Sequence, residues 1–472
     1  YYRKKPVQYI SNLLGHEGDG SLHALLNEKG WIKGLSAGES EMDEGNSVMS
    51  VNISLTEAGS AHVDEISAYL FAYLDLLKDG PIEEWIYQEQ ATVAQLAFRF
   101  SEKSSAMNAV RSIAPALQHY PAEDLLVAPY LMEEFDASLI RSFLTLLTRD
   151  NVLMTLSSPG YKGQSTEEWF GVSYDLELGE ISVATVDSGS LELPDANPFL
   201  PELLDLTQGD SLGPMPVIVD KGLELYMDTD LEFNVPRAVI HVSLRNDGGF
   251  IALADAAQSQ LYSMLVQDDL NALAYPALLA GVSYQIAAPP RGFRVSVGGY
   301  NDKQLVLLEE VLTRLMNLEI KEDRFDVVKG ELIKDLANSL KNKPFLQSYQ
   351  RSKDELLDSS WTAEQVIGAV EGVTPESLAA WRDSALQEVS IQGLVHGNVT
   401  KARVDELAGL LKQHVRISDV APVSTMVIEL EGASSMLLGI DHNDASMVLY
   451  VQDERSSFEN RARSTLLTHL VS

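Results

Sequence analysis

The chain contains no cysteine among its 472 residues. Disulfide bonds, a thiolate nucleophile and a thiolate metal site are therefore excluded, although this absence does not distinguish a cytoplasmic from a periplasmic protein. No apolar run reaches the about 18 residues that a membrane-spanning helix needs. The opening Tyr1-Tyr2-Arg3 has neither an initiator methionine nor a signal-peptide pattern. We therefore expect a fragment or a processed piece.

Basic residues are also scarce in this chain. It has 35 Lys and Arg against 69 Asp and Glu, which gives a formal charge of -34. Nucleic acids and anionic membranes need basic patches on a protein, so we expect neither as a partner. A solvated acidic surface that keeps a bacterial-type protein soluble is the simpler explanation. A hydrophobic content of 45% indicates folded domains, and the length predicts two or three of them.

An internal repeat of about 245 residues runs along the chain. Residues Ser50–Lys78 read as a strand, a turn and a long amphipathic helix, and Arg294–Leu318 read in the same way. After each of them we predict a second helix, and after more helix each unit closes with a strand. The second helices are predicted near Ile82–Phe98 and Lys321–Leu340, and the closing strands at Val152–Ser157 and Ile391–His396.

The two copies of the repeat differ at their front ends. The second unit begins with elements that the first lacks, since the first begins inside a helix. A third unit opens near the end of the chain. The front elements of the second unit are predicted as strands Leu223–Met227 and Val239–Arg245, helix Ala252–Leu270 and strand Ser283–Ala287; the third unit is predicted as strands Ser435–Ile440 and Ser446–Val451 and helix Ser457–Val471.

A proline-rich stretch, Leu191–Pro216, has few helix formers and is predicted to be an extended linker. A second boundary falls near Ile417–Val423. Strands that alternate with pairs of helices, without strict βαβ spacing, indicate α+β domains with an antiparallel-rich sheet and helices packed on one face. The predicted organisation is a domain at 1–190, a linker at 191–216, a domain at 217–418 and the start of another at 419–472.

The stretch Leu14–Glu39 is the most informative part of the sequence. It reads as a polar turn marked by glycines, then a helix, then a short strand that begins near Leu35. The turn contains Gly15, Gly18 and Gly20, the helix presents Leu22, Leu25 and Leu26 at helical spacing, and Gly30 ends it.

This stretch closely resembles the second domain of the insulinase/pitrilysin (M16) family of zinc metallopeptidases. Seven further segments resemble the family in the family's own order, so the resemblance covers essentially the whole chain. They are SLTEAG at 54–59, FRF at 98–100, TEEWFG at 166–171 with Tyr174, LPDANPFLP at 193–201, LAGVSY at 279–284, GYNDKQ at 299–304 and HGNVT at 396–400.

The resemblance implies an enzyme of four related α+β domains, arranged as two halves that close around a peptide. In the family a His-x-x-Glu-His motif and a later Glu bind zinc, and the motif's Glu activates the metal-bound water. None of the nine histidines here has another within four residues, so the motif is absent. We expect the zinc ligands to lie outside this chain and the chain to be inactive alone, with peptides and the missing first and fourth domains as its partners.

A peptide-binding edge is the family feature that this chain retains. The resemblance implies that Gly15 permits close approach, that Glu17 pairs with a peptide's terminal ammonium, and that one strand offers backbone hydrogen bonds to the peptide. Departures from some members are Gln8 and Asn12, which replace histidines, and Ala37, which replaces a glycine. A plain edge strand at the domain rim is the alternative. The strand residues are Leu35, Ser36, Ala37, Gly38 and Glu39.

Three weaker clusters of charged residues are interpreted as solvated surface. The first is His16-Glu17 with Asp19, the second is His62 with Asp64 and Glu65, and the third is the run ESEMDE at 39–44. No local tetrahedral ligand set is completed in the first two, and the third lacks the ligand spacing of a calcium loop.

The leading hypothesis is the non-catalytic portion of a zinc metalloendopeptidase, which supplies chamber wall and a site for the substrate's amino terminus. The alternative is a natural inactive partner subunit or peptide-binding module of the same family. The mass of the native protein separates them: about the size of this chain for a subunit, about twice that for a fragment. The resemblance to pitrilysin favours the periplasm over the cytoplasm, and exposed sheet edges predict self-association.

Overall fold

The structure is a computed structural model that describes residues 1–43, 45–179, 181, 183–208, 213–246, 248–421, 423, 425–452 and 457–471. The chain forms two compact units. The first comprises residues 1–205 together with 270–283 and 302–307, and the second comprises the remaining residues. The division between them at 205 falls inside the stretch predicted as a linker, while the domain boundaries given above stay a prediction.

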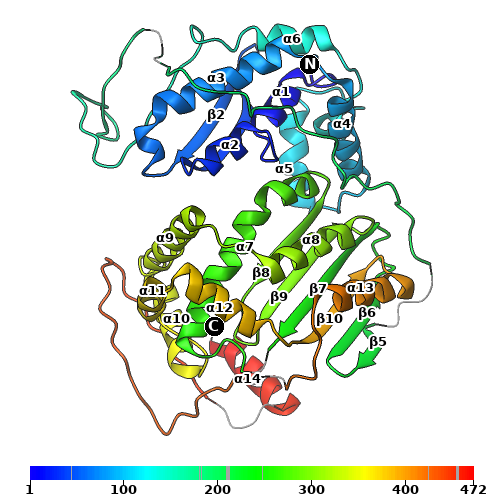
Figure 1. The fold of residues 1–472 in the computed structure, drawn as a ribbon, viewed down its shortest axis with the longest axis vertical. Coiled ribbons are helices and arrows are strands. Elements are labelled where there is room, and N and C mark those ends of the chain that lie inside the picture. The colour runs from blue at the N-terminus through cyan, green and yellow to red at the C-terminus, as the bar shows by residue number, and fades with distance from the viewer. Residues whose placement is uncertain are drawn as a thin grey trace. The chain divides into compact units, whose positions relative to one another are not determined.

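The first unit combines a two-stranded antiparallel sheet with several helices (Figure 1). Its elements are α1 (Pro6–Leu14), α2 (Leu22–Glu28), β1 (Ile32–Glu41), β2 (Ser47–Leu55), α3 (Val63–Asp79), α4 (Glu84–Arg99), α5 (Ala106–Ala116), α6 (Ala137–Leu144) and the short pair β3 (Ser165–Thr166) and β4 (Ser173–Tyr174). Its core consists of apolar residues from α1, α2, β1, α3, α4 and α6, among them Ile10, Leu26, Leu35, Tyr73 and Ile140.

Local chemistry explains the start of this unit. The Ser21 side chain accepts a hydrogen bond from the Ala24 backbone N–H at 3.0 Å and so caps α2. Gly30 has φ +69, which lets the chain leave the helix and enter β1. β1 then pairs with β2 in a register that sets Leu35 opposite Ile53 and Ala37 opposite Val51. The helix–glycine–strand prediction is confirmed, with β1 beginning at Ile32 rather than near Leu35.

The second unit contains a six-stranded mixed sheet in the order β5-β6-β10-β7-β9-β8. β10 lies between β6, to which it is parallel, and β7, to which it is antiparallel. Along β7, buried and partly exposed residues alternate, because one face of the sheet is covered by helices. The strands are β5 (Met215–Asp220), β6 (Leu223–Thr229), β7 (Arg237–Arg245), β8 (Val282–Ala287), β9 (Phe293–Tyr300) and β10 (Ser390–Gly397).

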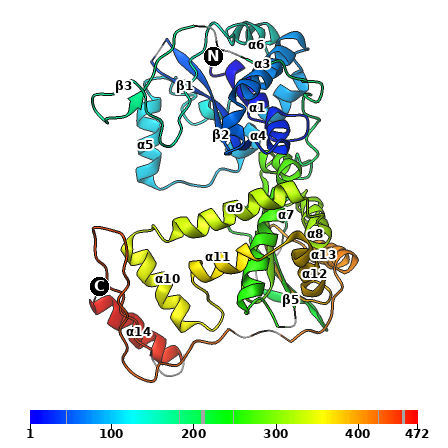
Figure 2. The same ribbon diagram turned by 60° about the vertical axis from the view of Figure 1, so that its left-hand side comes forward.

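Helices supply the rest of the second unit (Figure 2). Thr362 and Thr374 form capping boxes at the starts of two of them. Phe250, Tyr262, Phe293 and Trp381 form an aromatic cluster, with the Phe250 and Phe293 rings 5.0 Å apart. The helices are α7 (Leu253–Leu279), α8 (Gln304–Asn317), α9 (Glu322–Ser339), α10 (Pro344–Leu356), α11 (Ala363–Glu371), α12 (Pro375–Ala385), α13 (Lys401–His414) and α14 (Phe458–Val471). Residues 270–279 of α7 and 304–307 of α8 belong to the first unit.

The predicted α+β class is confirmed, as are the repeated strand–helix–helix elements and the last helix. Three predicted strands are wrong: Val152–Ser157, Ser435–Ile440 and Ser446–Val451 have strand-like sequences but lie in irregular segments. A strand needs a neighbouring backbone for its hydrogen bonds, and in the described structure no strand pairs with them. β5, in contrast, was not predicted from the sequence, because Pro216 stands at the end of the predicted linker and proline is disfavoured in strands.

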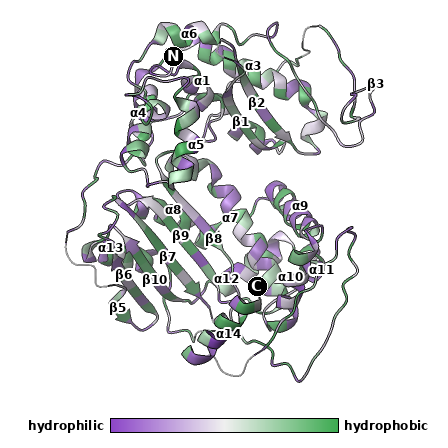
Figure 3. Cartoon of the chain, turned by 180° about the vertical axis from the view of Figure 1, so that it is seen from behind, coloured by the Kyte–Doolittle hydropathy of each residue, from purple (hydrophilic) through white to green (hydrophobic). Residues whose placement is uncertain are grey.

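Hydropathy alone does not separate the strands from these irregular segments. In Figure 3 the strands of the six-stranded sheet are largely hydrophobic in colour and lie beside helices. The residues of Val152–Ser157 are as apolar as those of β10, yet they are exposed. Over the described residues, no helix has the length and apolar character that crossing a membrane requires.

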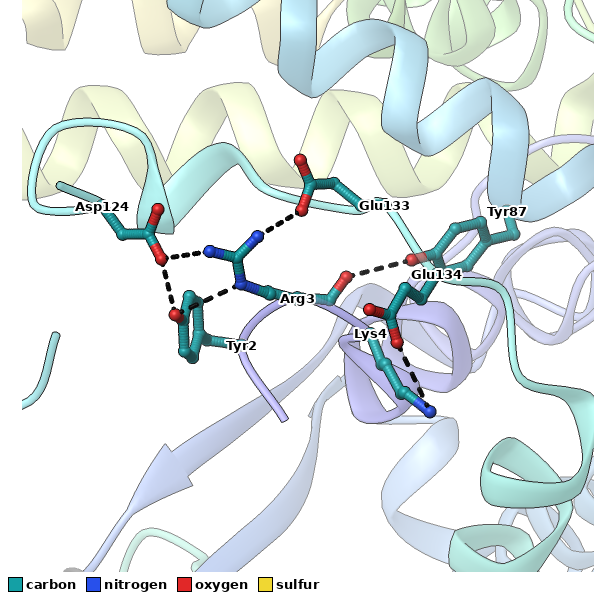
Figure 4. Close-up of polar contacts among 7 residues, drawn as sticks. All are labelled: Tyr2, Arg3, Lys4, Tyr87, Asp124, Glu133 and Glu134. Carbon is teal, nitrogen blue, oxygen red and sulfur yellow. Dashed lines mark hydrogen bonds and ion pairs between the residues drawn. The ribbon is translucent and has the colours of Figure 1, made fainter. Parts of the chain in front are cut away.

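Polar contacts fasten the first residues of the chain to a later part of the first unit (Figure 4). Arg3 forms ion pairs with Asp124 at 2.5 Å and with Glu133 at 2.7 Å. The Tyr2 hydroxyl donates to the Asp124 carboxylate at 2.6 Å. These hydrogen bonds, first from Tyr2 and then from Arg3, hold the pKa of Asp124 below its usual range.

Candidate functional site

The candidate edge strand is β1, whose only strand neighbour in the described structure is β2. Leu35 is buried in the core of the first unit, and Ala37 packs against it. Ser36 and Glu39 are exposed. The side chains of Leu35 and Ala37 therefore hold β1 on the core, while backbone groups on the side away from β2 have no strand partner among the described residues.

Gly15 lies directly against this strand. A Cβ atom at Gly15 would stand 3.2 Å from the Ser11 carbonyl oxygen and 3.4 Å from the Ala37 backbone nitrogen. The absent side chain thus allows the end of α1 to pack on β1. The Gly15 carbonyl also accepts a hydrogen bond from the Tyr275 hydroxyl at 3.1 Å, a contact within the first unit. The structure therefore brings Gly15 and the middle of β1 together.

His16 holds the glycine-rich turn in place. Its side chain is buried, and its Nδ1 accepts a hydrogen bond from the Gly18 backbone N–H at 3.0 Å. A Cβ at Gly18 would come within 2.6 Å of the imidazole. Burial lowers the pKa of His16, an effect that the neighbouring Glu17 carboxylate opposes. The interpretation of His16 as surface charge is therefore wrong: this side chain is structural, and only its glycine neighbours hinted at the close packing.

Glu17 lies in the same turn and is partly exposed. Its Oε2 accepts a hydrogen bond from the Asn271 side chain at 2.9 Å and lies 3.9 Å from the His23 Nε2. Both contacts are within the first unit. The carboxylate is thus positioned by neighbours rather than free to turn, and its part-exposed side chain remains reachable from solvent.

Gln8 and Asn12, the two residues named above as departures from some family members, lie on α1. Asn12 accepts a hydrogen bond through its Oδ1 from the Gln90 side chain on α4 at 3.2 Å. This polar contact joins α1 to α4.

The donor set of the described residues does not fit a zinc site of the family type. No group of three or more His, Asp or Glu side chains there could hold a metal ion. His62, one of the residues weighed as a ligand, pairs with Glu65 at 3.1 Å and stacks on Trp31 at a ring distance of 4.3 Å. His62 is thus held by a carboxylate and an aromatic ring within the first unit.

Together these features describe an α+β domain with an open strand edge on β1 and a tight glycine turn packed against it. Two family models match the chain: "Peptidase M16 inactive domain" over residues 1–93 and "Middle or third domain of peptidase_M16" over residues 98–369. The chain belongs to the peptidase M16 family. The predicted resemblance to the insulinase/pitrilysin family is confirmed.

Individual relatives show how much of their own length this chain matches. Human insulin-degrading enzyme is 33% identical over 414 residues, which cover 85% of this chain and 40% of the relative. The A-factor-processing enzyme of Saccharomyces cerevisiae is 28% identical, covering 87% and 41%. A crystal structure of pitrilysin shares the fold with a TM-score of 0.71 at 22% identity, covering 90% of this chain and 46% of that one. The chain thus spans less than half the length of these relatives.

Proposed function

We propose that this chain is the non-catalytic portion of a zinc metalloendopeptidase and that it holds the amino-terminal end of a peptide substrate along β1. The names of the curated relatives support a peptidase as the parent protein. The proposed residues are Gly15, Glu17 and the strand from Leu35 to Glu39. Zinc and the residues that activate water would come from parts of the parent outside this chain, so the chain alone would be inactive.

The position of β1 at the end of its sheet is the observation that carries the proposal. In the second unit a helix, a glycine with positive φ and two strands follow one another in the same order, through α7, Gly281, β8 and β9. There β8 is the last strand of a six-stranded sheet. The strand that follows the helix and the glycine is therefore the edge strand of its sheet even where the sheet has six strands. Its free backbone groups can accept an extended peptide as one further strand.

The side chains of the proposed site suit a peptide's first residues. Ser36, Ala37 and Gly38 are small, so a second backbone can approach β1 closely. Glu17 brings a carboxylate to the turn that packs on Ala37. A carboxylate stabilises an ammonium group through a charge-assisted hydrogen bond. The arrangement thus favours a free amino terminus over a blocked one.

Peptide binding tests this proposal directly. A peptide of about ten residues, labelled at its carboxyl end, is titrated with the chain and followed by fluorescence anisotropy, once with a free amino terminus and once acetylated. We expect about tenfold weaker binding of the acetylated peptide, the loss of one charge-assisted contact. Glu17→Gln should remove this preference. Equal affinity of both peptides for the unmodified chain would contradict the role of Glu17.

A pair of glycine variants tests the role of the turn. Gly15→Val places a side chain against Ala37 and should abolish peptide binding. Gly34→Ala is the matched control, because a Cβ there meets no atom within 4 Å. Unchanged binding by Gly15→Val, in a variant that is still folded by circular dichroism, would show that the peptide lies elsewhere.

A hydrolysis assay separates this proposal from an active enzyme. The chain is incubated with a quenched fluorescent peptide, with and without added zinc and with a chelator. We expect no cleavage in any condition. Chelator-sensitive cleavage that copurifies with the chain would mean that it has its own catalytic metal site, and the non-catalytic role would be wrong.

A further inference from the structure

One face of the six-stranded sheet in the second unit reverses the charge balance of the chain. The whole chain has 69 acidic and 35 basic residues. On β6, β10, β7 and β9, all of which the structure describes, the positions that alternate with the buried core carry more cations than carboxylates. They include Arg237, His241, Arg245, Arg294 and His396 on one side of the balance, and Glu224 and Asp228 on the other. This face is therefore locally cationic on a strongly acidic protein.

Both carboxylates of this face already have partners. The Asp228 Oδ2 lies 3.0 Å from the His396 Nδ1. The Glu224 Oε2 accepts a hydrogen bond from the Gln392 side chain at 3.0 Å, and the Gln392 Oε1 accepts one from Arg245. These contacts cross β6, β10 and β7. They leave the cations of β9 and of the middle of β7 without a carboxylate from their own face.

Arg294, His241 and His396 form a row across three neighbouring strands. His241 on β7 stands opposite Ser296 on β9 and Leu394 on β10, so Arg294 and His396 are its diagonal neighbours. Diagonal neighbours in an antiparallel sheet lie about 7–8 Å apart, within reach of long side chains. All three side chains of the row are exposed, so one ligand group can reach them from solvent.

The charges in this row repel one another. Partial burial lowers the pKa of His241, and the neighbouring Arg294 and His396 lower it further. The His241 Nδ1 contacts the Ser296 hydroxyl at 2.8 Å, and in the described structure neither His241 nor Arg294 forms an ion pair with a carboxylate. A bound anion would supply the missing negative charge and would favour the protonated form of His241.

We propose that Arg294, His241 and His396 bind an acidic side chain of an extended peptide, and bind it more tightly at about pH 5.5 than at about pH 8. The Arg294 guanidinium would donate charge-assisted hydrogen bonds, which it can form bidentately with a carboxylate. Protonated His241 would add a further donor. This surface belongs to the second unit and includes no residue of β1, so the inference goes beyond the proposed function and does not depend on it.

The spread of cations over the face favours acidic side chains over the carboxyl terminus of a peptide. Arg237 lies near one end of β7, with its guanidinium 4.9 Å from the centre of the Tyr300 ring, and Arg245 lies at the other end. A peptide has a single carboxyl terminus but can carry several acidic side chains. Cations along the length of β7 therefore complement an acidic peptide better than they complement one terminal charge.

Three labelled peptides of about ten residues, all with a blocked amino terminus, test the inference. One has three glutamates and an amidated carboxyl end, one has glutamines in their place, and one has glutamines and a free carboxyl end. Fluorescence anisotropy gives the affinity of the whole chain for each. We expect the glutamate peptide to bind about tenfold more tightly at the lower pH, as for one group that takes up a proton on binding. Equal binding of the first two peptides, or binding of the third alone, would overturn the inference.

Two pairs of matched variants locate the site. Arg294→Gln should weaken binding of the glutamate peptide about tenfold or more at both pH values, whereas Arg291→Gln removes the same charge from the exposed turn before β9 and should have little effect. His241→Gln should abolish the pH dependence, which His442→Gln at another exposed position should retain. All four side chains are exposed, so the melting temperature should not change. Equal effects within either pair would overturn the inference.

Histidine NMR reads the site directly and separates the two proposals. With the glutamate peptide bound, the His241 imidazole should titrate at a higher pH than without it, while exposed His119 should titrate as before. An unchanged His241 titration would contradict the inference. Gly15→Val, the variant that should block β1, should leave binding of the glutamate peptide intact. Loss of binding in that variant would place the peptide at β1, so the inference would fail while the proposed function stood.

Discussion

The two sheets of this protein are built from the same repeated sequence pattern but reach different degrees of completion. β9 and β10 lie inside a six-stranded sheet, whereas β2 lies in a two-stranded sheet and the counterpart of β10 is irregular. The apolar content of the corresponding segments is similar. The comparison shows that an alternating pattern specifies which face of a strand is apolar, while burial depends on whether a neighbour is present.

The first way to test this comparison is to truncate one apolar residue in each counterpart. Ile391→Ala in β10, where the side chain is buried, should lower the free energy of unfolding of the second unit by about 2–5 kcal/mol. Leu153→Ala in the irregular segment should change that of the first unit by less than about 0.5 kcal/mol. Urea unfolding followed by tryptophan fluorescence measures both. Similar costs at the two positions would mean that Leu153 is packed in solution.

The second test asks whether the two-stranded sheet, at the end where β1 begins and β2 ends, is as tightly packed as the larger sheet. A Cβ at Gly59 would lie 1.9 Å from the Trp31 carbonyl oxygen, at the junction of β1 with the turn after β2. Gly59→Ala should therefore destabilise the first unit by about 3 kcal/mol, the upper end of the usual cost of overpacking. Gly38→Ala, which meets no atom within 4 Å, serves as its control in the same urea experiment. Equal stability of the two variants would show that this end of the sheet is loose.

The third test concerns the pH dependence of the first unit. Burial lowers the pKa of His16 in the folded state. As the pH falls below about 6.5, this histidine is therefore protonated in the unfolded chain before it is protonated in the folded one. The contribution of neutral His16 is therefore complete above that pH and is lost below it. The melting temperature of the first unit should fall between pH 7.5 and 5.5, and less so in His16→Asn. His119→Asn, at an exposed position, should retain the full pH dependence; if it does not, His16 is not the group responsible.

The smallest effect is expected at the polar cluster of the first residues. The lowered pKa of Asp124 means that its charged form stabilises the folded state above the ordinary aspartate pKa of about 3.9, and that this contribution is lost as the pH falls through the lower, folded-state pKa. Asp124→Asn should lower the melting temperature slightly at pH 7, and the difference should shrink toward pH 3. Glu102→Gln at an exposed site should show no such difference. A constant difference across this range would assign the effect to packing.

Much of the fold could be predicted from the order of residues. Helices such as α3, α4 and α9 were predicted within a few residues, because their periodic apolar positions and terminal signals lie within one segment. For the candidate site, the turn at Gly15 and the strand at Leu35–Glu39 were found through family resemblance. The burial of His16 and the contact of Glu17 with Asn271 were not, since both depend on residues far apart along the chain.

The sequence by itself determined membership of the M16 family, the absence of the zinc motif and the positions of the main helices. Only the tertiary structure decided which strand-forming segments became strands. A helix forms its hydrogen bonds within its own segment, so local sequence is enough to predict it. A strand must receive them from another segment, and Ile391–His396 has such neighbours in β6 and β7, while Val152–Ser157 has none among the described strands.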